Sequence, residues 1–260
     1  MTDQDFYRLQ NQWAKIYFRD ISLGDLDRVR WINRLTGMRG VRILDLGAGG
    51  GQFSVAACQL NHKVTAVEIE SDFVEHMRFL ARHRNPENLT VINADFNTVE
   101  LEGDFNLICY WDGFGVGSDS DQRTLLKKIS SWLTPDGSVF LEIFTPWFWA
   151  SQAAGVKIPI GEAIREYGFD GAKCSMTDTW WLKDNPSFKT TQILRCYSPS
   201  DLTLLLEGSG LTILENFPGG FVDYSSGTYI PEVPLHQAMS YITRLVHTKL
   251  LNRITKGKQK

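Results

Sequence analysis

The sequence contains no apolar run that approaches 18 residues, which is about the shortest length at which a helix crosses a bilayer. Its first residues, "MTDQDFYRLQNQW", lack the basic start and apolar core of a secretory signal. These absences argue against stable membrane insertion and against export. We therefore expect a cytoplasmic protein.

Cysteine is scarce as well. Cys58, Cys109, Cys174 and Cys196 are far apart, and no two of them form a Cys-x-x-Cys pair. The spacing excludes the disulfide framework of a small secreted domain, so we expect free thiols, as in a reducing compartment. We assign no residue to a metal site.

An excess of positive charge is also missing. The 27 Lys and Arg residues against 30 Asp and Glu residues give a formal net charge of −3, which provides no general attraction to nucleic acid. The C-terminal end differs, because no acidic residue follows Glu232 while basic residues accumulate. These are Arg244, Lys249, Arg253, Lys256, Lys258 and Lys260. This tail is either a solvated end or a contact for an anionic partner or membrane surface.

What the sequence does contain is an alternation of short β-branched or aromatic runs with helical segments. At 260 residues and 43% hydrophobic residues, the chain can bury a sizeable core. We predict strands at 41–46, 63–68, 89–93, 105–111 and 138–144, and helices at 50–60, 71–84 and 119–133. This alternation predicts a doubly wound, mostly parallel α/β sheet.

Segments at either side of this alternation complete the domain. Residues 1–40 read as an N-terminal helical cap, whose second helix begins after Ser22 and ends at Gly37. Residues 145–197 read as a β-rich lid with antiparallel strands at 173–182 and 190–197. A helix at 198–210 and a strand at 211–217 follow, and 241–247 is a strand or a helix. We therefore expect a single domain, 1–260.

The glycine-rich stretch "LDLGAGGGQF" joins the first predicted strand to the first predicted helix of the sheet. Glycines there permit a tight turn with positive φ and allow a ligand to lie against bare backbone. A dinucleotide fold requires Gly-x-Gly-x-x-Gly, and counted from Gly47 the third position is Gln52, so the match fails. Asp45, two residues before the loop, would repel a pyrophosphate and favours a ligand with a cationic end.

Three further side chains follow the next strands of the predicted sheet, at the edge where open parallel sheets bind ligands. Glu68 ends the second strand and can accept both hydroxyls of a ribose. After the third strand, Asp95 can accept from an exocyclic amine while Phe96 packs on a purine. Together with Asp45, these residues are complementary to adenosine that carries a positively charged group.

The motifs "ILDLGAGGGQFS", "VTAVEIE", "NADF" and "WLTPDGSVFLEIF" resemble those of the class I S-adenosylmethionine-dependent methyltransferases, over about residues 41–144 and weakly over 197–247. The resemblance implies S-adenosylmethionine as cofactor. It also implies a seven-stranded sheet whose last strand is antiparallel, which favours a strand at 241–247.

The resemblance further implies a role for each matching residue. Asp45 would hold the amino group of the cofactor, and Gly47, Ala48 and Gly49 would back its amino-acid end. The remaining cofactor-binding assignments are Glu68 with Ile69 for the ribose, Asp95 and Phe96 for the adenine, and Tyr110 or Trp111 beside the methionine part. Trp13 and Tyr17 lie four apart in a predicted helix, and we add Tyr17 to this set. Packing on the sheet is the alternative for Tyr17.

Two departures from the family pattern stand out. Asn106 occupies a position where the family commonly has an acid, but at the start of its strand it should lie away from the site. No Asp/Asn-Pro-Pro-aromatic tetrapeptide follows the fourth strand. Because that tetrapeptide marks methylation of amines on nucleobases or protein amides, those acceptors are disfavoured.

The acceptor side of the site is less clearly marked. Aromatic side chains near a sulfonium attract it through cation–π interaction, and we assign Phe114, Phe144, Trp147, Trp149 and Trp180 to the substrate. Core packing is the alternative for each of them. No histidine lies between Asp112 and Leu235, so we take Asp112 as the candidate base, with a turn-forming role as the alternative. His236 is the second candidate, with a surface position as its alternative.

We therefore predict an enzyme that methylates a small, partly apolar molecule, at nitrogen slightly in preference to oxygen. The other hypotheses are a non-catalytic nucleotide-binding or scaffold protein on the same fold and an NAD-dependent oxidoreductase. No oligomeric state is predicted.

Overall fold

A seven-stranded sheet forms the centre of the computed structural model, which describes residues 3–257. Its strands lie in the order β10-β13-β5-β4-β1-β2-β3. They are β1 (Arg42–Leu46), β2 (Lys63–Glu68), β3 (Leu89–Asn93), β4 (Phe105–Phe114), β5 (Leu133–Phe144), β10 (Leu211–Pro218) and β13 (Ser240–His247). The predicted α/β fold with a large, mostly parallel sheet is confirmed, and residues 241–247 form a strand.

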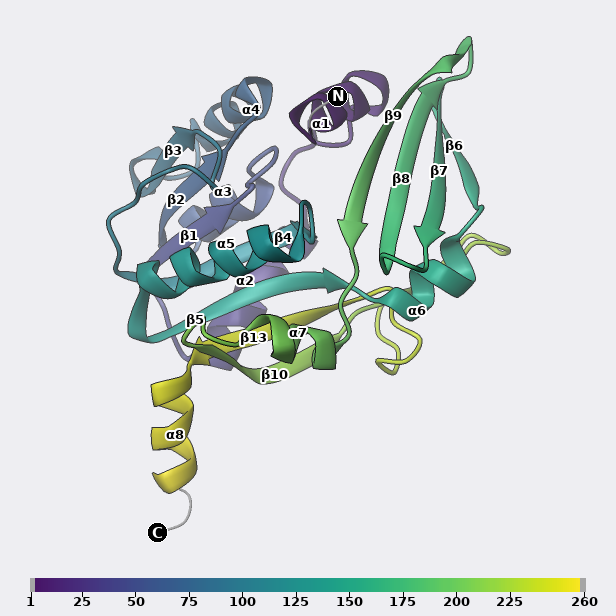
Figure 1. The fold of residues 1–260 in the computed structure, drawn as a ribbon. Helices are drawn as coiled ribbons and strands as arrows, with labels where there is room; N and C mark the ends of the chain where they lie inside the picture. The colour runs from purple at the N-terminus through teal and green to yellow at the C-terminus, as the bar shows by residue number, and fades with distance from the viewer. Residues whose placement is uncertain (1–2, 258–260) are drawn as a thin grey trace. The chain divides into compact units, whose positions relative to one another are not determined.

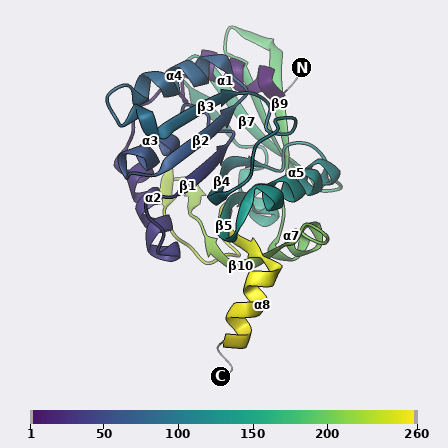
Figure 2. The same cartoon turned by 90° about the vertical axis from the view of Figure 1, so that its left-hand side faces the viewer.

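The order of the strands creates a switch point at the centre of the sheet. β1 pairs in parallel with β2 on one side and with β4 on the other, and β2 pairs in parallel with β3. The chain therefore moves outward from β1 to β3, which Figure 2 shows side by side, and then returns to β4 beside β1. Open α/β sheets bind ligands beyond the carboxyl ends of the strands at such a point.

The helices are α1 (Asp3–Ala14), α2 (Leu23–Thr36), α3 (Gln52–Gln59), α4 (Ser71–Ala81), α5 (Asp119–Trp132), α6 (Pro146–Phe148), α7 (Pro199–Leu205) and α8 (Thr248–Gly257). A 3₁₀ turn spans Pro86–Asn88 and a π turn spans Trp149–Ala153. The Ser22 hydroxyl accepts from the Asp25 backbone N–H at the start of α2, and Gly37 ends this helix at φ 70°, as predicted. Lys258 and Lys260 of the basic tail lie outside the described residues.

Packing divides the chain into two compact units. The loop-bearing unit consists of residues 15–111, 128–140 and 246–257 and contains the glycine-rich stretch. One buried cluster of this unit packs α3 and α4 against β2, through Val55, Ala66, Met77, Leu80 and Ala81. The strands β2 and β3 of this unit have the predicted bounds.

The insertion-bearing unit consists of residues 3–14, 112–127 and 141–245. It contains a second, antiparallel sheet, drawn in green in Figure 1. The strands of this sheet are β6 (Lys157–Ile160), β7 (Ala163–Asp170), β8 (Ser175–Leu182) and β9 (Asn185–Arg195), and a small hairpin pairs β11 (Phe221–Asp223) with β12 (Thr228–Ile230). The antiparallel pair β8–β9 was predicted, whereas β6 and β7 were not.

Two other elements differ from the expectation. β5 begins at Leu133 rather than at Ser138, because the strand continues back through Pro135 and Asp136 at its exposed end, where a proline needs no ladder partner. α1 ends at Ala14, and Lys15 has φ 51°. Tyr17 therefore does not share a helical face with Trp13, which corrects that prediction.

Candidate functional site

The loop between β1 and α3 presents bare backbone to three aromatic rings. Gly47 and Gly49 have φ values of 61° and 54°, in the left-handed region that favours glycine. A Cβ atom on Gly47 would lie 3.5 Å from Cε2 of Tyr110 and 3.6 Å from Cε1 of Phe96. A Cβ atom on Gly49 would lie 3.5 Å from Cδ1 of Tyr17. Side chains at these two positions would fill the space between the loop and the rings.

Asp45 lies beneath this loop with 1% of its surface exposed. Its Oδ2 accepts a hydrogen bond of 2.6 Å from the Ser54 hydroxyl. Its Oδ1 is buried and has no hydrogen-bond partner among the described residues. Burial raises the pKa of Asp45 to about 7, although the Ser54 bond opposes the shift. A buried carboxyl oxygen with unused lone pairs favours a ligand that brings a cationic donor.

Glu68, the last residue of β2, ties that strand to the glycine loop. Its Oε2 accepts from the Gly49 backbone N–H at 2.7 Å and its Oε1 accepts from the Glu70 N–H at 2.9 Å. Burial raises the pKa of this carboxyl, while the backbone N–H bonds lower it. Each carboxylate oxygen can accept more than one bond. The side chain can therefore also accept ligand hydroxyls.

The ends of β3 and β4 supply the remaining predicted residues. The rings of Phe96 and Tyr110 meet edge to face with centroids 5.2 Å apart, and Asp95 Oδ1 accepts from the Asn97 N–H at 2.8 Å. Ile69, after β2, has 37% of its surface exposed. The Trp111 ring contacts Phe53 with centroids 5.2 Å apart. All eleven residues assigned to the cofactor thus belong to the loop-bearing unit.

Residues 43–137 match a family model described as a methyltransferase domain. These residues carry a methyltransferase domain of the class I S-adenosylmethionine-dependent type. Its fold is similar to that of the CcbJ methyltransferase from Streptomyces caelestis, with a TM-score of 0.73 and 16% identity over 95% of this chain and 99% of that one.

Two curated relatives of this methyltransferase act on different atoms. The (S)-coclaurine N-methyltransferase of Thalictrum flavum subsp. glaucum is 31% identical over 105 residues, which are 40% of this chain and 28% of that protein. The ubiquinone biosynthesis O-methyltransferase of Xanthomonas campestris pv. campestris is 25% identical over 157 residues, 58% of this chain and 65% of that protein. The chain thus spans less than two thirds of the length of either relative.

The residues of this methyltransferase fit S-adenosylmethionine, the cofactor of the family. The unsatisfied Oδ1 of Asp45 is complementary to the ammonium group of the cofactor, and the Glu68 carboxylate is complementary to its ribose diol. The bare backbone at Gly47 and the rings beside it complement a ligand with flat and apolar parts. In contrast, a pyrophosphate would place negative charge beside Asp45.

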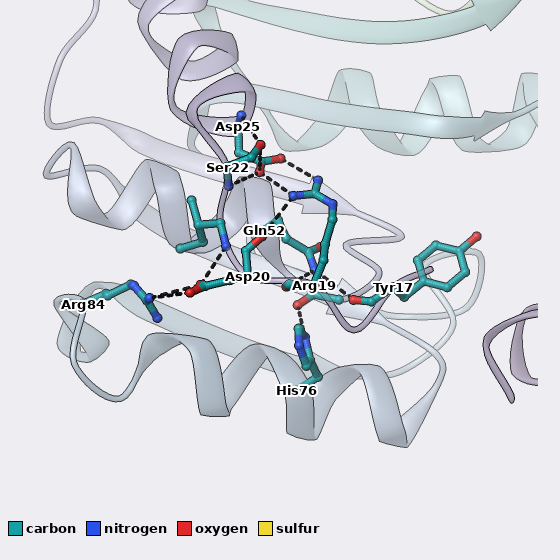
Figure 3. A network of polar contacts seen from close by, with 10 residues as sticks. Tyr17, Arg19, Asp20, Ser22, Asp25, Gln52, His76 and Arg84 are labelled. Atoms are coloured by element: carbon teal, nitrogen blue, oxygen red, sulfur yellow. Dashed lines mark hydrogen bonds and ion pairs between the residues drawn. The ribbon is translucent and has the colours of Figure 1, made fainter. Parts of the chain in front are cut away.

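Gln52, the residue that breaks the dinucleotide pattern, has a specific role in this methyltransferase. Its side chain is 8% exposed, and its Nε2 donates to the Tyr17 carbonyl at 2.8 Å and to the Arg19 carbonyl at 2.9 Å. Figure 3 shows how these bonds hold the segment 15–21, hereafter the strap, against the start of α3. The Tyr17 ring packs on Phe73, with centroids 4.6 Å apart.

Two ion pairs fasten the strap on its outer side. Arg19 pairs with Asp25 at 2.6 Å, and Arg84 pairs with Asp20 at 3.0 Å. The Arg84–Asp20 pair is partly exposed and adds little, of the order of 0–1 kcal/mol, whereas Arg19 donates to both oxygens of the Asp25 carboxylate at 2.6 Å and 2.8 Å. The buried Gln52 amide holds the strap from its inner side, through the carbonyls of Tyr17 and Arg19.

Replacement of Gln52 by alanine should release the strap and weaken S-adenosylmethionine binding about tenfold. The variant loses both bonds to the strap, and leaves two carbonyls without their donor. Calorimetric titration measures the affinity, and amide hydrogen exchange of residues 15–21 measures the release. Arg84→Ala, which removes only an outer ion pair, is the control. Unchanged exchange and affinity in Gln52→Ala would show that the strap is held by other contacts.

The residues assigned to the substrate all belong to the insertion-bearing unit. Phe144 and Trp149 meet edge to face in a buried cluster, with centroids 5.2 Å apart, and the Trp149 Nε1 donates to the Met239 carbonyl at 2.9 Å. Phe114 is fully buried with its ring 5.7 Å from that of Tyr197. Trp180 is fully buried too, in a cluster with Phe6. These positions are core packing, and a further contact with substrate stays a prediction.

Trp147 and the two candidate bases differ from this buried set. Trp147 is half-buried, and its Nε1 is buried with no hydrogen-bond partner within residues 3–257. Asp112 is exposed, and its φ of 55° places a non-glycine residue in the left-handed region, a strain that is common at functional sites. His236 is exposed in the loop before β13.

In the described part of the chain, no three His, Cys, Asp or Glu side chains are grouped to hold a metal, and no helix is long and apolar enough to span a membrane.

Sequence reasoning missed three residues that shape this site. Ser54 holds one oxygen of Asp45, and Phe73 supports Tyr17. Arg28 places its guanidinium carbon 4.6 Å from the Trp111 ring centroid and lowers the pKa of Asp45 by its charge. A polar residue in the first turn after a glycine loop could have indicated Ser54. No local signal in α2 distinguishes Arg28. Asn106, by contrast, lies where predicted, at the start of β4, with its Oδ1 accepting from the Arg42 N–H at 3.1 Å.

Proposed function

We propose that this chain transfers the methyl group of S-adenosylmethionine to a small, partly apolar molecule, at nitrogen in preference to oxygen. The observation that carries the proposal is the unsatisfied, buried Oδ1 of Asp45 below the bare backbone of Gly47 and Gly49. A cationic amino acid joined to adenosine complements this arrangement. The relatives support a small acceptor, since their names refer to coclaurine and to ubiquinone biosynthesis.

In this proposal the loop-bearing unit holds the cofactor. Asp45 binds the amino group, Gly47, Ala48 and Gly49 back the amino-acid end, and Tyr17, Tyr110 and Trp111 line the methionine part. Glu68 and Ile69 contact the ribose, while Asp95 and Phe96 contact the adenine. Bound S-adenosylmethionine supplies an electrophilic methyl group, so the protein needs only to align the acceptor, exclude water and remove a proton.

We propose that Asp112 accepts the proton that the methyl acceptor loses. It follows Trp111 directly in the chain, and its charge acts on Arg165 and Tyr167 of the insertion-bearing unit. The Asp112 carboxylate would accept the proton that the acceptor amine gives up on receiving the methyl group. Phe114, Phe144, Trp147, Trp149 and Trp180 support the acceptor surface, and His236 is the alternative proton acceptor. The four cysteines are free thiols, which is compatible with a protein that functions in the reducing cytoplasm.

Titration with S-adenosylmethionine, S-adenosylhomocysteine and NAD tests the proposal. We expect micromolar binding of the first two and none of NAD. Incubation of a metabolite extract with the isotope-labelled cofactor should then yield labelled methylated products by mass spectrometry. Asp112→Asn should keep the affinity for S-adenosylhomocysteine and lose most of the turnover. Binding of NAD alone would contradict the proposal, and cofactor binding without any labelled product would indicate a scaffold.

A further inference from the structure

One face of the antiparallel sheet in the insertion-bearing unit carries a row of polar side chains. Tyr167 of β7 pairs with Asp178 of β8, which in turn pairs with Gln192 of β9. Arg165 lies two residues before Tyr167 and so projects from the same face. Directly paired residues on one face have Cβ atoms about 5 Å apart. Arg165, Asp178 and Gln192 therefore form a contiguous row across three strands.

Arg165 is held rigidly in this row. Its Nε and Nη2 donate to the two oxygens of Asp178 at 2.9 Å and 2.7 Å. Its guanidinium carbon lies 4.5 Å from the Tyr167 ring centroid and 5.1 Å from that of Trp180. No hydrogen bond of Nη1 to a described residue accompanies these contacts. The Nη1 group of Arg165 is thus held in a fixed orientation but donates no hydrogen bond to a described residue.

Gln192, the pairing partner of Asp178 on β9, has a second unused donor. The residue is 4% exposed, and its Nε2 is buried without a hydrogen-bond partner among residues 3–257. Thr190, two residues earlier on the same face, is 1% exposed, and its hydroxyl is also without a described partner. A buried polar group left unpaired costs about 1–3 kcal/mol. Such groups in native proteins call for a partner.

The ion pair in this row is weak evidence of a contribution to stability. A buried pair of charges is often replaced by well-packed apolar residues at no loss of stability, because desolvation offsets the attraction. The row combines the Arg165 guanidinium, the Gln192 amide and the Thr190 hydroxyl on the buried face of the sheet. Binding of a ligand therefore explains these groups better than a contribution to stability does.

We propose that Arg165 and Gln192 bind an sp² oxygen, of a carboxylate or a carbonyl group, on the methyl acceptor. The inference rests on the proposed function and specifies the acceptor as an amine that also carries such an oxygen. Both residues present N–H donors without an acceptor, and an sp² oxygen provides the lone pairs that they lack. Asp178 keeps the fork of Arg165 in place and is a positioning residue. Asp112, whose charge acts on Arg165, supplies the negative group that an amine would meet.

The specificity of such a site should be high. When buried donors of an enzyme hydrogen-bond an oxygen of the substrate, the enzyme rejects a substrate analogue that lacks this oxygen, because the donors are then left unpaired. Two series of matched compounds test this. The first is L-phenylalanine, L-phenylalaninamide and phenethylamine, and the second is anthranilate, anthranilamide and aniline. Each series presents a carboxylate, a carbonyl and neither group on a similar apolar frame.

Binding of each compound is measured on protein saturated with S-adenosylhomocysteine. In at least one series we expect the acid or the amide to bind at least tenfold more tightly than the parent amine. Which of the two binds more tightly shows whether the site prefers a carboxylate or a carbonyl group. Gln192→Met, which conserves volume, and Arg165→Lys, which conserves charge without the fork, should each reduce this ratio at least threefold. Thr191→Val, on the opposite and exposed face of β9, should leave it unchanged.

Three results would overturn the inference: equal binding within both series, no binding of any oxygen-bearing member, or an unchanged ratio in both Gln192→Met and Arg165→Lys. Saturation with S-adenosylhomocysteine is measured first. If the wild-type protein does not bind it, the proposed function fails. If it binds while the preference is absent, only the assignment of Arg165 and Gln192 fails.

Discussion

Glu68→Ala should lower the affinity for S-adenosylmethionine at least about 100-fold. In the proposed complex this carboxylate accepts two ribose hydroxyls, and a hydrogen bond to a charged group contributes about 1.5–3 kcal/mol. The same side chain also accepts from the Gly49 N–H at 2.7 Å and thereby holds the loop. Its loss therefore removes ligand contacts and loosens the backbone that the ligand lies against. Calorimetric titration measures the change.

Glu68→Gln separates these two contributions. The amide keeps the volume and one acceptor oxygen, so we expect an intermediate loss of about tenfold. Glu75→Gln is the matched control, because Glu75 is 68% exposed on α4 and pairs with the neighbouring Arg78. Circular dichroism must show that all variants are folded. Wild-type affinity in folded Glu68→Ala would mean that the ribose is not bound at β2.

The elements around the cofactor loop could be predicted because their signals are local. β2 and β3 are β-branched runs with the predicted bounds, and α2 begins with a Ser-x-x-Asp capping box. The failed glycine match at Gln52 correctly excluded a dinucleotide loop. The reason why glutamine is present there is not local, since its bonds reach the strap more than 30 residues earlier in the chain.

The insertion could be predicted only in part, because tertiary contacts decide its pattern. β7, "AIREYGFD", has Arg165 and Tyr167 on its buried face and Ile164 on the other. The apolar/polar alternation that indicates a strand is thus absent, and only the ion pair with Asp178 makes burial of Arg165 tolerable. β6 contains a proline, which argues against a strand in sequence-based reasoning. Conversely, Phe114 and Trp180 owe their complete burial to packing partners that are distant in sequence.

The affinity for S-adenosylmethionine should rise steeply from pH 5 to pH 7 and then level off. Burial raises the pKa of Asp45 to about 7 in the folded protein without ligand, so the carboxyl is mostly protonated at pH 5. A neutral carboxyl attracts the ammonium group of the cofactor weakly, and binding below pH 7 must therefore release a proton. We expect up to a tenfold gain in affinity per pH unit. Titration at pH 6 in buffers with different ionisation enthalpies measures the released proton.

The stability of the protein without ligand should change in the opposite sense. Between about pH 4 and pH 7, folded Asp45 holds a proton that the unfolded chain has lost. The linkage relation then makes the free energy of unfolding fall as pH rises, and Asp45 alone contributes at most about 1.4 kcal/mol per pH unit. The raised pKa of Glu68 acts in the same direction. Denaturant unfolding across this range measures the slope, and saturating cofactor should reduce it because the ligand favours the ionised carboxyl.

Asp45→Asn distinguishes this carboxyl from every other titrating group. The amide has nearly the shape of the protonated acid, so we expect the variant to bind S-adenosylmethionine within about threefold of the wild type at pH 5. At pH 8 the wild type is ionised, and the variant should bind about 100-fold more weakly. Asp27→Asn, at an exposed ion pair with Arg30 on α2, should follow the wild type at both pH values. A constant ratio between Asp45→Asn and wild type would show that Asp45 does not titrate in this range, and the ammonium group would then have to be bound by another residue.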